Sequence, residues 1–166
     1  MPRRDLTRPS LPSRRVRRVP TAATPIAFVR ALLLAYERYG VSPEEVLRQG
    51  QITPEMLADP EARITARQME IVSEGAMRQL DDEALGWFSR KLPWGTLGML
   101  CRASLTSPTL GVALKRWCRH HRLLTQDIDL QLLVDGDVAT LQIDEHRRLG
   151  ALREFCLVSC LRYVHG

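Results

Sequence analysis

The chain has 166 residues, of which 45% are hydrophobic and 26% charged, a composition typical of one globular domain. No run approaches the roughly 18 apolar residues that a membrane helix needs, and residues 1–25 lack the apolar segment of a signal peptide, which argues against membrane and secreted classes. The net charge of +5 arises at the N-terminus: residues 1–25 carry seven Arg and one Asp, whereas residues 26–166 carry 17 basic and 18 acidic residues. The overall charge therefore gives no reason to class the globular part as a nucleic-acid binder, and we expect a cytoplasmic protein.

Residues 1–25 form a basic leader. They combine five prolines with an Arg-rich run at 14–18 and almost no large apolar side chains. Such a segment cannot bury enough surface to offset the entropy of ordering, so we predict that it is disordered. A solvated tail, a basic arm for nucleic acid or an acidic partner, and a transit peptide all fit this composition. A nucleic-acid arm would bind with a steep salt dependence that vanishes when residues 1–23 are deleted.

Residues 26–90 predict a series of helices joined by tight turns. Proline one residue after a Ser or Thr cap, followed by an acidic residue, marks two of the starts, and a capping box of Thr65 and Gln68 marks another. We expect these helices from Ile26 to about Tyr39, from Ser42 to near Gly50, from Thr53 to before Asp59, from Thr65 to about Leu80, and over a short segment capped by Asp81-Asp82-Glu83 that contains Leu85 and Trp87.

The clearest helix signal lies at residues 107–124. Ser107 is predicted to cap this helix and Pro108 to occupy its first position, and a tight loop with two glycines at residues 93–98 precedes a shorter helix before it. The apolar face is predicted to carry Leu110, Ala113, Leu114, Trp117 and Leu124, and the polar face Lys115, Arg116, Arg119 and Arg122. The basic residues are expected to be a solvated helix face, because no aromatic side chains lie among them to stack on bases.

A β-hairpin and a last helix follow. Apolar and polar residues alternate over 128–132 and 139–143 around an Asp135-Gly136-Asp137 turn, which predicts a hairpin with one apolar face. That face must pack on something, and the helix just before it is the nearest candidate. Residues 149–163 then show helical spacing. We therefore predict a helix-rich α+β fold with a small antiparallel sheet packed on helices, and expect further strands from a larger unit or a partner.

Chemical motifs are few. The sequence has no phosphate-binding glycine loop, nucleophile elbow or His-Glu-x-x-His motif, so we expect neither an enzyme nor a bound cofactor. Cys118, His120 and His121 offer ligands for zinc or haem iron, yet they point in different directions on a helix. Cys156 and Cys160 share a helical face. Core packing of reduced thiols is the favoured interpretation for the cysteines, and a metal or haem sensor using Cys118 and His121 is an alternative.

An ordered set of loose motifs resembles a known family. The set comprises Thr24-Pro25 before the helix from Phe28 to Tyr39, the Gly40-Val41-Ser42 turn, the Ile64-Thr65 helix start, Trp94-Gly95-Thr96-Leu97-Gly98, residues 107–114 and the Asp135-Gly136-Asp137 strand pair. In this order they resemble the N-terminal arabinose-binding-type regulatory domain of AraC family transcription regulators, over roughly residues 25–166. The branch is the one with a helical start and without the cupin-type sugar pocket.

The resemblance implies a bacterial regulator whose N-terminal domain senses a small molecule or mediates dimerisation, while a C-terminal pair of helix-turn-helix units contacts DNA. Those units and the further strands of the sensor domain are absent from this sequence, so we expect an N-terminal piece, from a fragment or a truncated reading frame. We hypothesise that an effector binds beside the 94–99 loop and the Trp117 face, and so shifts a homodimer equilibrium. The predicted effector-binding residues are Trp94, Thr96, Met99, Trp117 and His121.

Overall fold

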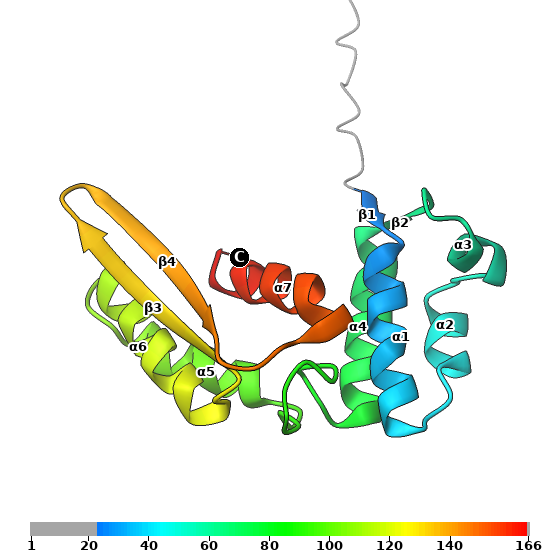
Figure 1. The fold of residues 1–166 in the computed structure, drawn as a ribbon, viewed down its shortest axis with the longest axis horizontal. Coiled ribbons are helices and arrows are strands. Elements are labelled where there is room, and N and C mark those ends of the chain that lie inside the picture. The colour runs from blue at the N-terminus through cyan, green and yellow to red at the C-terminus, as the bar shows by residue number, and fades with distance from the viewer. Residues whose placement is uncertain (1–22, 166) are drawn as a thin grey trace, which may run out of the picture.

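A computed structural model describes residues 23–165 and confirms the helix-rich α+β class (Figure 1). Most of the predicted basic leader, residues 1–22, lies outside the described residues. The elements are β1 (Ala23–Pro25), α1 (Ala27–Tyr39), α2 (Glu44–Gln49), α3 (Pro54–Ala58), β2 (Arg63–Thr65), α4 (Ala66–Leu80), α5 (Thr96–Leu105), α6 (Leu110–Leu124), β3 (Ile128–Asp135), β4 (Val138–Glu145), the 3-10 turn η1 (Gly150–Leu152) and α7 (Arg153–His165).

The first part of the fold is built on the neighbouring helices α1 and α4 (Figure 1). Their contact buries an apolar stripe on each helix, and the Tyr36 hydroxyl of α1 donates a 2.8 Å hydrogen bond to Gln79 of α4. Strands β1 and β2 pair antiparallel beside them, with Thr24 opposite Ile64. The predicted disorder of the leader is therefore wrong for residues 23–25, because the pairing with β2 satisfies backbone groups that the leader's composition alone does not reveal.

The caps and turn residues in the sequence predicted these helices well. Thr65 and Gln68 form the predicted capping box, Thr53 accepts from the backbone N–H of Met56, and Gly40 ends α1 in the left-handed conformation (φ 65°). The buried stripe of α1 contains Val29, Leu32, Ala35 and Tyr36. Phe28, at the margin of this stripe, is partly buried and packs edge-on against Phe155 of α7.

The carboxylate of Asp82 organises the segment that follows α4. Asp82 is fully buried, and its two oxygens accept hydrogen bonds from the backbone N–H groups of Ala84 (3.0 Å), Gly86 (2.8 Å) and Leu92 (2.9 Å). The hydroxyl of Tyr39 on α1 donates a fourth, at 2.7 Å. A buried carboxylate is costly unless such donors surround it. Asp82 therefore sets the path of residues 82–92 and ties this path to α1.

The short helix predicted after Asp81-Asp82-Glu83 is absent, and that prediction was wrong. Residues 83–86 form a turn, because Leu85 (φ 47°) and Gly86 (φ 77°) adopt left-handed backbone conformations that end any helix. A left-handed leucine costs roughly 1–2 kcal/mol. The hydrogen bonds from Ala84 and Gly86 to Asp82 offset this cost and hold the turn.

Helices α5 and α6 and the β3–β4 hairpin form the second part of the fold. Helix α6 packs along β3, as predicted, and the hairpin register places Leu130 opposite Ile143 and Asp135 opposite Val138. The predicted cap of α6 was wrong by two residues. Thr109, in extended conformation, accepts from the backbone N–H of Val112 at 3.2 Å, and Pro108 lies before the helix. Leu110 is consequently 74% exposed instead of buried.

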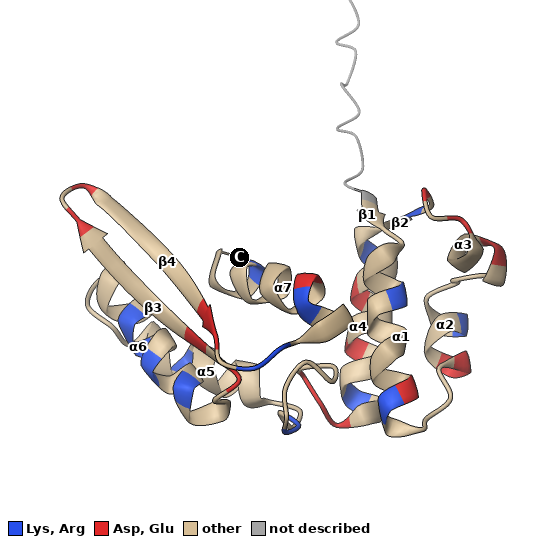
Figure 2. Ribbon diagram, in the orientation of Figure 1, with Lys and Arg blue, Asp and Glu red and all other residues tan. Residues whose placement is uncertain are grey.

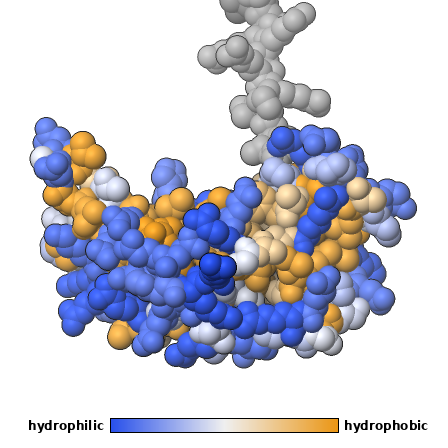
Figure 3. All heavy atoms as spheres, viewed as in Figure 1, coloured by the Kyte–Doolittle hydropathy of each residue, from blue (hydrophilic) through white to orange (hydrophobic). Residues whose placement is uncertain are grey.

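The far half of the hairpin extends away from the rest of the molecule (Figure 1). Its predicted apolar face is buried only near the base, at Ile128 and Leu130. Toward the turn, Leu133, Val134 and Val138 are exposed, and apolar surface is visible at this end in Figure 3.

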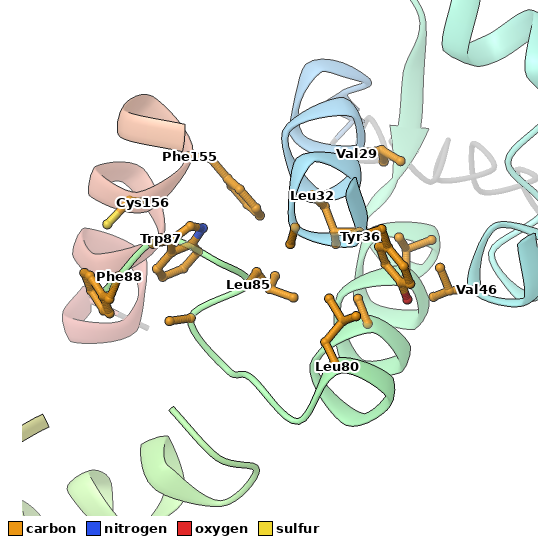
Figure 4. Close-up of a cluster of buried hydrophobic side chains, with 14 of the residues drawn as sticks. Val29, Leu32, Tyr36, Val46, Leu80, Leu85, Trp87, Phe88, Phe155 and Cys156 are labelled. Carbon is orange, nitrogen blue, oxygen red and sulfur yellow. The ribbon is translucent and has the colours of Figure 1, made fainter. Parts of the chain in front are cut away.

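Helix α7 lies between the two parts of the fold (Figure 1). Phe155 points from α7 toward α1 and Leu32, and Trp87 lies between α7 and the turn that carries Leu85 (Figure 4). The rings of Trp87 and Phe155 meet edge-on with centroids 5.3 Å apart. The principal hydrophobic core therefore runs from α4 through α1 and the 82–92 segment to α7.

Replacing Asp82 by Asn is expected to lower the free energy of unfolding by about 3 kcal/mol, because one oxygen becomes a donor that faces other donors. Tyr39→Phe removes one hydrogen bond only and is expected to cost about 1 kcal/mol. Urea unfolding followed by circular dichroism measures both values. An Asp82→Asn protein as stable as the wild type would contradict the organising role of this carboxylate.

Candidate functional site

A small cavity lies where α5, α6, α7, β3 and the 82–92 segment meet, and we call it the α6–α7 cavity. Its volume is about 40 Å³, room for about three water molecules. Most of its wall is apolar. It is lined by Glu83, Ala84, Trp87, Phe88, Leu92, Thr96, Leu97, Leu100, Trp117, His121, Leu124, Leu130, Cys160 and Tyr163.

Two acidic side chains position the walls of this cavity. Glu83 accepts hydrogen bonds from the backbone N–H groups of Gly95 (2.7 Å) and Leu97 (2.5 Å), so its carboxylate caps the N-terminus of α5. Asp127, just before β3, accepts from the backbone N–H and the hydroxyl of Ser89. These bonds attach the 82–92 segment to α5 and to the hairpin, and thereby close the cavity on two sides.

The structure brings three of the five predicted effector-binding residues together. Thr96, Trp117 and His121 line the α6–α7 cavity. Trp94 lies outside it, 42% exposed, with the Arg78 guanidinium 4.1 Å above its ring. Met99 is 54% exposed on α5 and also lies outside the cavity. An effector contact at these residues stays a prediction, and the geometry favours the first three.

Sequence reasoning missed much of the cavity wall. Trp87 was assigned to a helix that does not form, Phe88 was not considered, and Cys160 and Tyr163 lie far away in the sequence. Cys160 and Tyr163 have a signal in the sequence, since both follow the helical spacing of residues 149–163. Only the packing of α7 against α6 could show that this helix contributes to the cavity.

Two polar groups of the cavity wall lack a full set of partners: the indole Nε1 of Trp87 and the Nδ1 of His121 are buried without a hydrogen-bond partner. His121 is 7% exposed, and its ring meets Phe88 edge-on. A buried nitrogen without a partner is uncommon in folded proteins. Burial also raises the pKa of the neighbouring Tyr163 to about 12, so this phenol stays neutral. The lining of the cavity thus includes one neutral phenol, one unpartnered imidazole nitrogen and the unpartnered indole N–H of Trp87 among mostly apolar side chains.

The proposed metal-ligand set does not converge. Cys118 is buried in a cluster with Leu100, Trp117 and Leu130, and burial raises the pKa of its thiol. Within residues 23–165, no group of three His, Cys, Asp or Glu side chains is placed to hold a metal ion.

Comparison with known proteins decides the family. Residues 40–166 match the family model described as the arabinose-binding domain of AraC transcription regulators, N-terminal. The ornithine utilization regulator of Pseudomonas aeruginosa is 30% identical over 132 residues, a region that covers 79% of this chain and 39% of that regulator. The chain belongs to the AraC N-terminal domain family. The predicted resemblance is thereby confirmed, and this AraC-type domain spans less than half the length of the regulator it matches.

The basic face of α6 in this AraC-type domain is partly used for internal contacts. Arg122 forms an ion pair with Asp129 of β3, with Nε 2.9 Å from the carboxylate, and Arg116 donates to the Ser107 hydroxyl at 3.1 Å. The blue segments of α6 in Figure 2 mark the positions of its Lys and Arg residues. Among the described helices, none is long and apolar enough to cross a membrane.

A second hollow, the α4–α7 groove, lies on the other side of α7. Its volume is about 290 Å³, and Tyr163 borders both hollows. Charged and hydroxyl side chains contribute to its lining, namely Glu70, Ser73, Ser159 and Arg162. Glu70 is already paired with Arg67 at 2.9 Å. Helix α7 of the AraC-type domain therefore separates a small apolar cavity from a larger and more polar groove.

The ion pair of Arg122 and Asp129 predicts a pH dependence of stability. The hydrogen bond from Arg122 holds the pKa of Asp129 below its usual range. A carboxyl whose pKa is lower in the folded state stabilises the fold above its unfolded pKa of about 4, and this contribution is lost as the pH falls through the folded pKa. Asp129→Asn is therefore expected to lower the free energy of unfolding near pH 7, with a difference that shrinks below about pH 4.

Urea unfolding of both proteins near neutral pH and again near pH 3 tests this expectation. Asp135→Asn, at the exposed end of the hairpin, is the matched control and is expected to change stability little at either pH. A loss in Asp129→Asn that stays the same size in acid would show that the ion pair is not its cause.

Proposed function

We propose that this chain is the effector-sensing part of an AraC-type transcription regulator, and that the effector binds in the α6–α7 cavity. The single observation that carries the site is the unpartnered Nδ1 of buried His121 in the wall of that cavity. A small group that hydrogen-bonds this nitrogen gains an interaction that the empty fold lacks. Family membership supports the regulatory role, because the matched family is a ligand-binding domain of regulators.

The size of the cavity supports a mechanism. About 40 Å³ admits only a small group, so a metabolite-sized effector has to displace part of the wall. The wall is made by α5, α6 and α7, and these helices are packed against one another and against the hairpin. A ligand that occupies an enlarged cavity favours the conformation in which these helices have moved apart. Binding thereby shifts the equilibrium between two packings of the domain.

The partners in this proposal are a small-molecule effector, a second copy of the domain and DNA. The homodimer supplies the equilibrium that effector binding would shift. DNA would be contacted through a helix-turn-helix half that is not in this sequence, in the cytoplasm. The chain by itself is accordingly expected to bind no operator DNA.

Two sets of compounds are suitable first probes. Ornithine and related amino acids form the first set, because the similar regulator of Pseudomonas aeruginosa is named for ornithine utilization. Short monocarboxylic acids form the second, because a small acceptor fits beside His121 within apolar walls. Isothermal titration calorimetry with the purified chain detects binding from either set.

A compound that binds is expected to lose at least about tenfold in affinity in Leu97→Phe, which fills the cavity, and in His121→Gln, which removes the imidazole. Leu123→Phe, at an exposed position of α6 outside the cavity, is the control and is expected to leave affinity unchanged. Ser73→Tyr places a large side chain in the α4–α7 groove and so distinguishes the two hollows as candidate binding sites. If Ser73→Tyr abolishes binding while Leu97→Phe preserves it, the effector site is the groove and the proposed cavity site is wrong.

A further inference from the structure

The turn of the β3–β4 hairpin, residues 133–138, combines negative charge with exposed apolar side chains, and we call it the acidic turn. Leu133, Val134 and Val138 are exposed, and so are Asp135 and Asp137, which lie between Val134 and Val138 in the sequence. Figure 2 marks acidic residues at this end of the hairpin. Among residues 23–165, neither carboxylate has a hydrogen-bond or ion-pair partner. The acidic turn therefore presents charge and apolar area that its own domain does not cover.

One side of α6 carries the opposite charge. The helix contains four basic residues and no acidic one. Lys115 and Arg119 lie four residues apart, so they share a face of the helix, and both are exposed. The buried residues of α6 lie on its other side, namely Trp117, Cys118 and His121. Lys115 and Arg119 therefore point away from the core and from β3.

Lys115 and Arg119 differ from the other two cations of α6. Arg116 and Arg122 are already held within the domain, by the hydroxyl contact and the ion pair described above. In the described part of the chain, Lys115 and Arg119 have no such partner. Val112, half-buried, lies one turn before Lys115 on the same side. We call Val112, Lys115 and Arg119 the α6 stripe.

We propose that a second copy of this domain covers the acidic turn, with its α6 stripe against Asp135 and Asp137. The proposal rests on the proposed function in taking the partner to be a second copy, and it names the surface of that homodimer. Charge complementarity supports it, because two carboxylates without partners meet two cations without partners. The aliphatic stems of Lys115 and Arg119 cover the apolar residues of the turn.

A two-fold axis lets each copy use both surfaces. In such a dimer, the acidic turn of each copy contacts the α6 stripe of the other, so the contact is made twice. The far half of the hairpin extends away from the rest of the molecule (Figure 1), which leaves the turn accessible to a neighbouring copy. Both surfaces are small, so we expect a weak dimer that forms at high protein concentration, while dilute protein is monomeric.

The first test is sedimentation velocity of the purified chain over a series of protein concentrations, in about 0.1 M and about 1 M salt. The expected result is a monomer–dimer equilibrium that weakens at least about tenfold in the higher salt, because the screening length falls from about 10 Å to about 3 Å. A chain that stays monomeric at every concentration overturns the proposal. So does a dimer that the higher salt leaves unchanged or strengthens.

Two charge-reversed variants locate the surface. Asp135→Lys with Asp137→Lys reverses the acidic turn, and Lys115→Glu with Arg119→Glu reverses the α6 stripe. Each variant alone is expected to dimerise at least about tenfold more weakly, because like charges then meet. An equimolar mixture of the two is expected to dimerise as the wild type does, since each turn then meets a stripe of opposite charge. Such recovery requires the turn of one copy to contact the α6 stripe of the other, and a variant that unfolds cannot produce it.

Glu37→Lys with Glu44→Lys is the matched control, because it changes the net charge as the turn variant does, at exposed positions of α1 and α2. It is expected to leave the dimer unchanged. Circular dichroism establishes that each variant folds, and Asp135→Asn with Asp137→Asn, expected to weaken the dimer, replaces a turn variant that does not.

A mixture of the two reversed variants that stays monomeric overturns the proposal. A loss of dimer in the turn variant without a loss in the stripe variant also overturns it, and assigns the turn to another basic segment, such as the leader. No effector is present in these experiments. Their failure is therefore separable from failure of the proposed effector site, which calorimetry tests with the cavity variants.

Discussion

The fold depends on one buried carboxylate. Asp82 accepts hydrogen bonds from three backbone N–H groups and from the Tyr39 hydroxyl. These bonds fix the path of residues 82–92, which form one wall of the α6–α7 cavity. That wall packs on α1 on one side and carries Trp87 and Phe88 toward α7 on the other. The left-handed backbone at Leu85 is tolerated only because these hydrogen bonds hold it. The core and the candidate site therefore share one support.

Helix α7 connects the features that bear on function. Its residues contribute to the principal core, to the α6–α7 cavity and to the α4–α7 groove. A change at either hollow that shifts α7 also changes the packing of Phe155 against Trp87 and Phe28. Such a shared helix is a physical route by which a group bound at one hollow alters a larger contact.

Local sequence signals predicted most elements, because caps, prolines and periodicity act within a few residues. The capping box at Thr65, the Gly40 stop and the hairpin are of this kind. The failures occur where distant residues decide. The turn at Asp82 needs Tyr39, and the wall of the cavity needs α7, which follows about 40 residues after α6 begins. For the same reason, three of the five predicted effector-binding residues line the α6–α7 cavity, whereas Trp94 lies outside it and packs against Arg78.

The hairpin has a consequence for self-association. Residues 128–145 contain five acidic side chains and no basic one, and Arg122 and Arg153 from neighbouring helices neutralise only Asp129 and Glu145. Asp135 and Asp137 remain beside the exposed apolar residues at the turn. Two copies of this hairpin brought edge to edge would therefore repel each other, in the way that charged edge strands resist aggregation. The acidic turn therefore disfavours edge-to-edge pairing of the exposed apolar strand pair with a second hairpin.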